Sequence, residues 1–157
     1  MEFFKNRTFA LKGIIVHTPD FDHMEYHENE YVICKDGRSV GIFHELPEEY
    51  QEIPVLDFSD KFIIPGMCDM HVHAPQYGFR GLGMLLDCNS EWETWFDRYS
   101  FPEESRYADL EYADKAYGRF VDDLLKTTTT TRASIFATIH RPATELLMRK
   151  LADAGFS

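Results

Sequence analysis

The sequence predicts an α/β protein in which a strand-rich segment, residues 1–64, precedes two consecutive βα units in residues 65–157. Before Pro65, short runs of β-branched and aromatic residues are separated by turn-forming residues, a pattern typical of strands. After Pro65, short apolar runs alternate with longer segments whose apolar residues recur at helical spacing. Strands that alternate with helices are joined by crossovers, so we expect parallel strands with helices packed outside them.

The first segment is expected to contain strands over residues 9–17, 31–46 and 55–65. The second of these runs is interrupted by Asp36-Gly37, a dipeptide that favours the two-residue turn of a β-hairpin. Residues 18–30 are polar and acidic, which predicts a loop or a solvated insertion between the first two strands.

The second segment is expected to contain strands over 67–73 and 127–140 and helices over 110–126 and 141–155. In the first helix, apolar residues recur at three- and four-residue steps, as in an amphipathic helix. The second helix has Pro142 near its start and Gly155 past its end, where helices favour these two residues.

Composition excludes several classes of partner. The formal net charge of -11 argues against binding to a phosphate backbone, so nucleic acid is not an expected partner. The first twenty residues do not resemble a signal peptide, and no run of about 18 apolar residues predicts a membrane span. Cys34, Cys68 and Cys88 lack the spacing of a disulfide framework or a cysteine zinc site, which favours a reducing, cytoplasmic location.

The stretch Asp-Met-His-Val-His, residues 69–73, predicts a metal site. In a strand, His71 and His73 point to the same face with Cα atoms about 6.5–7 Å apart, so both imidazoles can bind one metal ion. Val72 is then expected to face the helix layer. Asp69 shares the face of the histidines but lies deeper along the strand, so we expect it to have a supporting role.

The position of this motif along the strand also favours function. Pro75 stops further strand pairing, so His73 lies at the carboxyl end, where parallel βα folds form active sites. The alternative is a pair of partly buried histidines that only pack or hydrogen-bond. The preceding Pro65-Gly66 turn and the βα pattern that follows favour the metal site.

The stretch PGMCDMHVH, residues 65–73, resembles the PGxxDxHxH signature of the amidohydrolase superfamily of metal-dependent hydrolases. The later segments HAPQYGFRGLG, YSFPEES and TTRASIFATIHRPATELL are similar to those of the guanine deaminases within that superfamily. The resemblance is strong over residues 55–155, and it extends to the first 54 residues only through their strand pattern.

The resemblance implies a site for one Zn²⁺ ion, with His71 and His73 as the first two ligands. It also implies that His73, Ala74, Pro75 and Gln76 line the pocket for the purine. The carboxamide of Gln76 can donate and accept at once against the lactam edge of guanine. The implied reaction is the hydrolytic deamination of guanine to xanthine and ammonia in purine catabolism, with a zinc-activated water and a carboxylate that transfers its proton.

The resemblance further implies that residues 65–157 are the first two βα units of an amidohydrolase-type (β/α)₈ TIM barrel, preceded by a small β-sandwich segment over 1–64. A whole barrel needs about 250 residues. We therefore expect no catalytic residue within this chain, no activity of the chain alone, and a homodimer at full length. Two alternatives are another purine or aromatic deaminase of the superfamily and a non-catalytic remnant that binds a partner.

Several other polar residues are expected to be structural. His23 and His27 could chelate a metal from one helix, but they lie in an acidic stretch without helical patterning, which favours unrelated surface histidines. Arg80 is expected to form a loop salt bridge in preference to an anion site. Asp122 and Asp123 are expected on the solvent side of the first helix, without a functional role.

His140 is expected to end the second strand of the barrel in a structural or outer-shell role. Trp92, Trp95 and Phe101 could stack on a flat purine, although core packing explains them equally well.

Two segments depart from the family pattern. The stretch KTTTTTR, residues 126–132, lacks the glycine that usually follows the first barrel helix, so a strained or rebuilt turn is expected there. The segment over residues 85–95 is longer than expected between the HAPQ loop and YSFPEE, which bears on the wall of the pocket.

Overall fold

The computed structural model describes residues 8–86 and 92–156. The chain divides into two compact units, Met1–Pro65 and Gly66–Ser157, which are described separately. Among the described residues, none of the helices has the length and apolarity that crossing a membrane requires.

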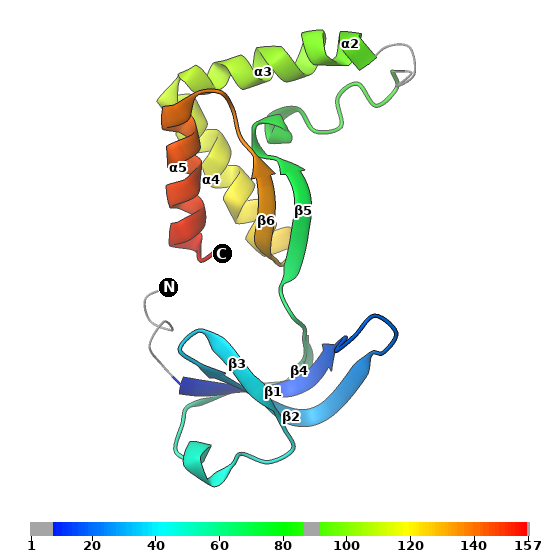
Figure 1. The fold of residues 1–157 in the computed structure, drawn as a ribbon, viewed down its shortest axis with the longest axis vertical. Helices are drawn as coiled ribbons and strands as arrows, with labels where there is room; N and C mark the ends of the chain where they lie inside the picture. Colours follow the sequence, from blue (N-terminus) through cyan, green and yellow to red (C-terminus); the bar gives the residue numbers. More distant parts are fainter. Residues whose placement is uncertain (1–7, 87–91, 157) are drawn as a thin grey trace. The chain divides into compact units, whose positions relative to one another are not determined.

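The first unit contains a four-stranded sheet with the strand order β3-β2-β1-β4 (Figure 1). Its strands are β1 (Thr8–His17), β2 (Glu25–Lys35), β3 (Arg38–Phe43) and β4 (Val55–Ile63). The β1–β2 and β2–β3 pairs are antiparallel, whereas β4 runs parallel to β1. The three predicted strand regions are confirmed, and the predicted sandwich around them stays a prediction.

The hairpin between β2 and β3 turns at the predicted dipeptide. Asp36 and Gly37 have φ values of 50° and 76°, and the type I′ turn of a tight hairpin requires positive φ at both positions. The prediction of a loop over residues 18–30 is wrong from Glu25 onward. Residues 25–30 belong to β2 because β1 offers them a partner, with Tyr26 opposite Val16.

The two faces of this sheet differ in what covers them. On one face, Ala10 and Ile33 lie opposite each other and pack with Tyr50 in a small buried cluster. On the other face, the next pair, Leu11 and Val32, lines an open apolar cavity of about 680 Å³.

The second unit contains two parallel strands, β5 (Met67–His73) and β6 (Thr130–Phe136), with two long helices, α4 (Leu110–Thr127) and α5 (Arg141–Ala154) (Figure 1). The crossover from β5 passes through a 3₁₀ turn, η2 (Ala74–Phe79), and two short helices, α2 (Trp92–Trp95) and α3 (Phe101–Ser105). The strand predicted over 127–140 is too long at both ends. Thr127 completes α4, and the chain leaves the sheet after Phe136.

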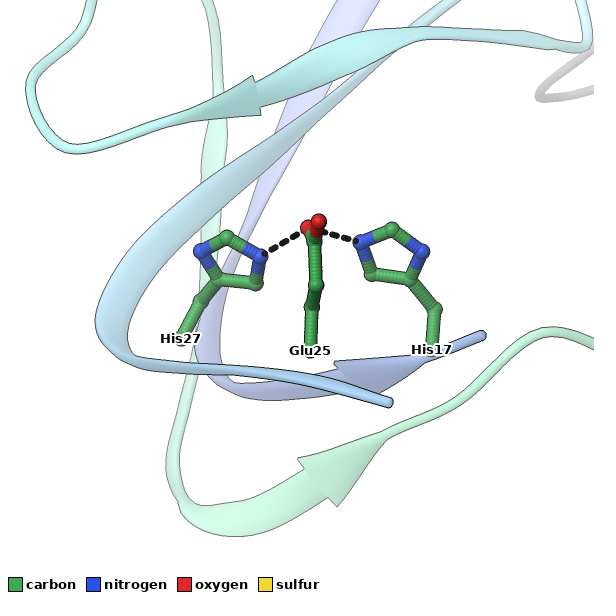
Figure 2. Close-up of side chains that lie close together, drawn as sticks. All are labelled: His17, Glu25 and His27. Carbon is green, nitrogen blue, oxygen red and sulfur yellow. Dashed lines mark hydrogen bonds and ion pairs between the residues drawn. The ribbon is translucent and has the colours of Figure 1, made fainter. Parts of the chain in front are cut away.

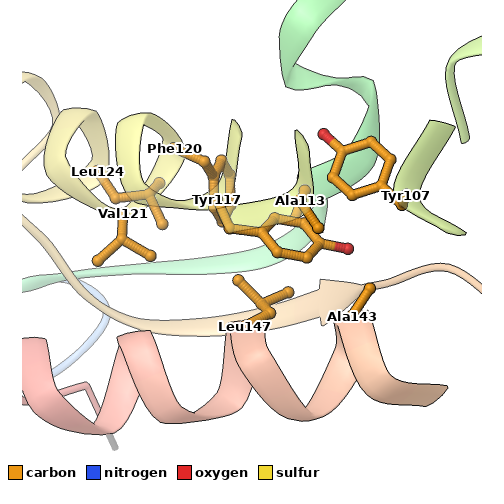
Figure 3. Packing of buried hydrophobic residues seen from close by; sticks show 9 residues of the cluster. Tyr107, Ala113, Tyr117, Phe120, Val121, Leu124, Ala143 and Leu147 are labelled. Carbon is orange, nitrogen blue, oxygen red and sulfur yellow. The ribbon is translucent and has the colours of Figure 1, made fainter. Parts of the chain in front are cut away.

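The core of the second unit lies between its strands and helices (Figure 3). The predicted amphipathic face of α4 is confirmed, and it buries Ala113, Tyr117, Phe120, Val121 and Leu124. Helix α5 contributes Ala143 and Leu147, while Val72 and Ile135 pack against the cluster from the two strands. Asp109 caps α4 by accepting hydrogen bonds from the backbone N–H groups of Glu111 and Tyr112.

The start of β5 passes very close to β6. A Cβ atom on Gly66 would collide with the side chain of Thr131, so glycine is required for this approach. The neighbouring Met67 N–H donates to the carbonyl of Thr129 over 3.0 Å. Thr129 has a φ of 51°, a left-handed conformation unfavourable for a β-branched residue. The strained turn expected from the missing glycine is therefore present.

Candidate metal and purine site

The side chains of His71 and His73 converge at the end of β5. Their Nε2 atoms are 3.0 Å apart. Two ligands of a tetrahedral zinc ion, with bonds of about 2.0 Å, lie about 3.3 Å apart. The two imidazoles thus fit a shared metal ion with little movement, and the strand provides their common face because they are two residues apart.

Phe136, at the end of β6, packs against both imidazoles. Its ring centroid is 4.5 Å from that of His73, with 7° between the planes, and 5.0 Å from that of His71. Because β5 and β6 are in register at His73 and Phe136, the sheet itself brings these rings together. The sequence predicts no role for Phe136, although this residue lies within the segment TTRASIFATIHRPATELL.

The remaining residues of the motif lie as the strand pattern predicts. Val72 faces the opposite way from the histidines and packs against the helical core. Asp69 accepts a hydrogen bond from the backbone N–H of His71 over 3.1 Å. Asp69 therefore supports the backbone that carries the first histidine.

The carboxamide of Gln76 is held by two polar residues of the crossover. Its nitrogen donates to Ser100 Oγ over 3.2 Å and to Glu104 Oε1 over 3.3 Å. Ser100 is fully buried and itself donates to Glu104 over 3.0 Å. Since both amide hydrogens have partners, the carbonyl oxygen of Gln76 is left to accept a hydrogen bond from a ligand. No local pattern within YSFPEES distinguishes Ser100 or Glu104 from the neighbouring polar residues.

A cavity of about 300 Å³ joins these groups. His71, His73 and Gln76 line it together with aromatic and loop residues that include Phe79, Arg80 and Trp95. Ala74 and Pro75 are buried and are not among the residues that line this cavity, and their predicted contact with the purine stays a prediction.

The aromatic residues considered for stacking lie in different places. Trp95 lines the cavity, with its ring centroid 5.5 Å from that of Phe79. Phe101 is exposed and stacks on Phe96 outside the cavity lining. The side chain of Trp92 and residues 87–91 of the longer segment lie outside the described part of the chain.

A second polar group fastens the loop after β5 to α4. The Tyr77 hydroxyl donates to Asp123, and the guanidinium of Arg80 lies 3.8 Å from the same carboxylate. Arg80 also covers the Tyr77 ring at 3.8 Å. The loop salt bridge expected for Arg80 is confirmed. Asp123 thus has structural contacts with the loop, whereas Asp122 forms an exposed pair with Lys126, and the expectation that neither has a functional role stays a prediction.

Two further histidines are structural or exposed. His140 lies beyond the end of β6, so the prediction that it ends the strand is wrong. It precedes α5 as its N-cap residue, and its carbonyl accepts from the backbone N–H of Thr144. His23 is exposed and pairs with Asp20 at 2.8 Å.

Tyrosines lie behind the Gln76 network. Burial, reinforced by a hydrogen bond to Glu103, raises the pKa of Tyr112 to about 12. Burial likewise raises the pKa of Tyr117 to about 12. These phenols therefore stay neutral, and the Tyr112 hydroxyl donates to Glu103 next to the residue that holds Gln76.

No family model matches the chain. A guanine deaminase from Dictyostelium discoideum is 32% identical over 165 residues, covering 92% of this chain and 35% of the relative. A guanine deaminase from Rattus norvegicus is 38% identical over 163 residues, covering 95% of this chain and 34% of the relative. A crystal structure of guanine deaminase from C. acetobutylicum, with guanine in its active site, is 36% identical with a TM-score of 0.84. It covers 96% of this chain and 35% of that chain.

The chain is thus similar to the amino-terminal part of guanine deaminases and spans about a third of the length of these relatives. The structural likeness shows a fold of the amidohydrolase type.

Proposed function

We propose that this chain provides the first metal ligands and part of the purine pocket of a guanine deaminase. The protein would hydrolyse guanine to xanthine and ammonia. The observation that carries the proposal is the convergence of the His71 and His73 Nε2 atoms, 3.0 Å apart, in one cavity with the anchored amide of Gln76. The similarity to guanine deaminases supports this substrate over other aromatic amines.

The proposal includes the finer architecture. Residues 65–157 would form the first two βα units of a (β/α)₈ barrel, and residues 1–64 would contribute to a β-sandwich. The parallel pairing of β5 with β6, covered by α4 and α5, supports the proposed barrel architecture. The half-exposed side chains of Met67 and Phe136 are also consistent with strands that face further parts of a barrel.

His71 and His73 would hold one zinc ion, which when bound supplies Lewis-acid activation of water and substrate. Phe136 supports the two imidazoles from β6, and Asp69 supports their strand. The chain itself would therefore pre-orient the two ligands before the metal arrives.

Gln76 would orient the purine. Because Ser100 and Glu104 occupy its amide hydrogens, its carbonyl oxygen would accept from the N–H on the lactam edge of guanine. This is narrower than the donor-and-acceptor role predicted from the residue type. Trp95, on the cavity wall, would limit the space to a flat ring.

Location and assembly complete the proposal. A cytoplasmic location is supported by Cys34 and Cys68, which are both free thiols. The full-length enzyme would act as a homodimer on a small-molecule substrate, as the resemblance to guanine deaminases implies.

A chimera tests the proposal directly. This chain replaces the corresponding amino-terminal third of the C. acetobutylicum guanine deaminase, and xanthine and ammonia are measured. We expect turnover of guanine by the chimera and none by the isolated 157-residue chain. His71→Ala and His73→Ala should each lower kcat/KM by roughly 100-fold or more, because metal-ion stabilisation supplies several kcal/mol.

Two further variants separate binding from folding effects. Gln76→Ala should raise KM for guanine by about tenfold, the loss of roughly one hydrogen bond. His23→Ala is the matched control, since this exposed histidine pairs only with Asp20 among the contacts described, and it should leave kcat/KM unchanged. A folded chimera that binds zinc without deaminating guanine, or that prefers another amino-purine, would contradict the assignment.

A further inference from the structure

The first unit contains a group of metal-ligating side chains that is separate from the site on β5. His17 lies at the end of β1, opposite Glu25 at the start of β2, and His27 follows Glu25 by two residues. The antiparallel register therefore places all three side chains on one face of the β1–β2 pair. Their potential ligand atoms lie within 4.8 Å of one another.

Figure 2 shows the carboxylate of Glu25 between the two imidazoles. Its Oε2 atom is 3.2 Å from Nε2 of His17 and 3.2 Å from Nε2 of His27. Both distances are close to the spacing of about 3.3 Å between two ligands of a tetrahedral zinc ion. The imidazole planes are 9° apart, so the rings face each other in parallel.

The contact between His27 Nδ1 and Glu30 determines the protonation of the other ring nitrogen, Nε2, which faces Glu25. The Nδ1 atom of His27 lies 2.9 Å from Glu30 Oε2, and a carboxylate accepts only, so Nδ1 carries the hydrogen. In the neutral ring, the lone pair of Nε2 then points at an oxygen of Glu25. This contact of 3.2 Å is a hydrogen bond when the ring carries a hydrogen on both nitrogens; in the neutral ring, a metal ion between the two atoms would take the place of that hydrogen. A carboxylate that orients a metal-ligating histidine in this way is a frequent feature of metal sites.

His17 points to the same conclusion. Among the described residues, its buried Nε2 has no hydrogen-bond partner, and its contact with Glu25 Oε2 over 3.2 Å is an ion pair only if the ring is protonated. A buried, unpaired imidazole nitrogen costs free energy unless something coordinates it. Both imidazoles are about three-quarters buried, whereas Glu25 is half exposed, which leaves a path for an ion from solvent.

We propose that His17, Glu25 and His27 form a second metal site, which binds a divalent first-row transition-metal ion such as Zn²⁺ and joins the ends of β1 and β2. Two imidazoles and one carboxylate suit such an ion better than Ca²⁺ or Mg²⁺, which prefer oxygen ligands. The site goes beyond the proposed deaminase function, since all its ligands lie in the first unit.

The test measures Co²⁺ binding to the 157-residue chain that carries His71→Ala and His73→Ala, which removes the site on β5. We expect one equivalent of Co²⁺ to bind, with the visible absorption of a nitrogen- and oxygen-ligated ion. Glu30→Gln should weaken binding about 10- to 100-fold, because Glu30 only orients His27. His27→Gln should abolish saturable binding, while His23→Ala, four residues away and exposed, should leave it unchanged.

Saturable binding that His27→Gln leaves unchanged would overturn the proposal, as would no binding below about 1 mM Co²⁺. A second measurement needs no substitution in the hairpin. Substoichiometric Co²⁺ added to the chain that carries His71→Ala and His73→Ala, with its hairpin unaltered, should broaden the imidazole NMR signals of His17 and His27. Broadening confined to other histidines would show that the group is only a protonated hydrogen-bond network. Failure of the deaminase proposal would leave both measurements unaffected.

Discussion

The two histidine pairs of this chain are supported in different ways. His71 and His73 are two residues apart on one strand, and their sheet is backed by a core to which α4 and α5 contribute most residues. His17 and His27 come from neighbouring strands, and the groups that contact them are the carboxylates of Glu25 and Glu30. Hydrophobic packing therefore positions the first pair, whereas hairpin register and charge position the second.

Removing core volume should produce the largest difference in stability between the two units, because it should destabilise only the second. Leu147, on α5, is 2% exposed in the core of the second unit, so Leu147→Ala should destabilise this unit by about 2–4 kcal/mol. Hydrogen exchange should show lost protection in residues 66–156 and unchanged protection in the first unit. Met148→Ala, at a side chain 65% exposed, should change stability by less than about 0.5 kcal/mol. Equal loss of protection in both units would show that they are not independent.

Alkaline pH should also act selectively on the second unit. Burial raises the pKa of Tyr112 and Tyr117 to about 12, above the ordinary value of 10.0. The unfolded chain therefore loses these protons first, so the contribution of these two tyrosines to stability should be constant below about pH 10 and should fall between about pH 10 and 12. Unfolding of the second unit, followed at several pH values, measures the slope.

Tyr117→Phe is the informative variant for this pH dependence. The Tyr117 hydroxyl is buried and has no hydrogen bond of good geometry among the described residues, although the Thr138 side chain interacts with it, so its removal should change stability only slightly at pH 7. The same change should flatten the fall in stability above pH 10. An unchanged slope would mean that the tyrosines ionise together in the folded protein.

Relief of the strained turn should give a smaller effect with the opposite sign. Thr129 has a φ of 51°, and a threonine held there costs about 1–2 kcal/mol. Thr129→Gly should stabilise the second unit by about 0.5–1 kcal/mol, because the larger conformational entropy that glycine loses on folding offsets part of the relieved strain. Thr127→Gly is the control, since Thr127 ends α4 and glycine there should destabilise it. Thermal unfolding of both variants measures whether each substitution raises or lowers the stability.

Thiol reactivity should show the smallest difference between the regions. Burial raises the pKa of Cys34, which lines the apolar cavity of the first unit, whereas Cys68 on β5 is exposed. In a Cys88→Ser background at pH 8, Cys34 should react with iodoacetamide roughly tenfold more slowly than Cys68, because the thiolate is the reacting form. Equal rates, measured by mass spectrometry, would indicate that the first unit opens frequently.

Local spacing explains which site residues the sequence could predict. His71 and His73 share a face because of strand geometry alone, so their convergence follows from five consecutive residues. The sequence predicts that His27 is an unrelated surface histidine, since it lies in an acidic stretch without helical patterning and its partner His17 belongs to another strand. The β1–β2 register brings His17 and His27 together. The sequence does not predict this register, because the acidic start of β2 resembles a loop.

Contacts between residues far apart in the sequence explain most of the other differences between the predictions and the structure. Asp123 meets Tyr77 across 46 residues, and Ser100 meets Gln76 across 24, so neither partner could be identified from a local pattern. The strand predicted over 127–140 was too long because a run of threonines suits both a helix end and a strand. In the structure, packing of α4 extends the helix to Thr127, and the strand begins only at Thr130.

Gly66 has a consequence for the tolerance of this gene to mutation. Every missense change at its codon adds a Cβ atom, and each such atom would meet the short, branched side chain of Thr131. Purifying selection on this codon would therefore originate in a threonine 65 positions further along the chain, and not in the neighbouring histidines. A compensating change is available at one place, because loss of the Thr131 side chain in a Thr131→Gly background would open the space. The two codons should accordingly vary together among descendants of this sequence, if they vary at all.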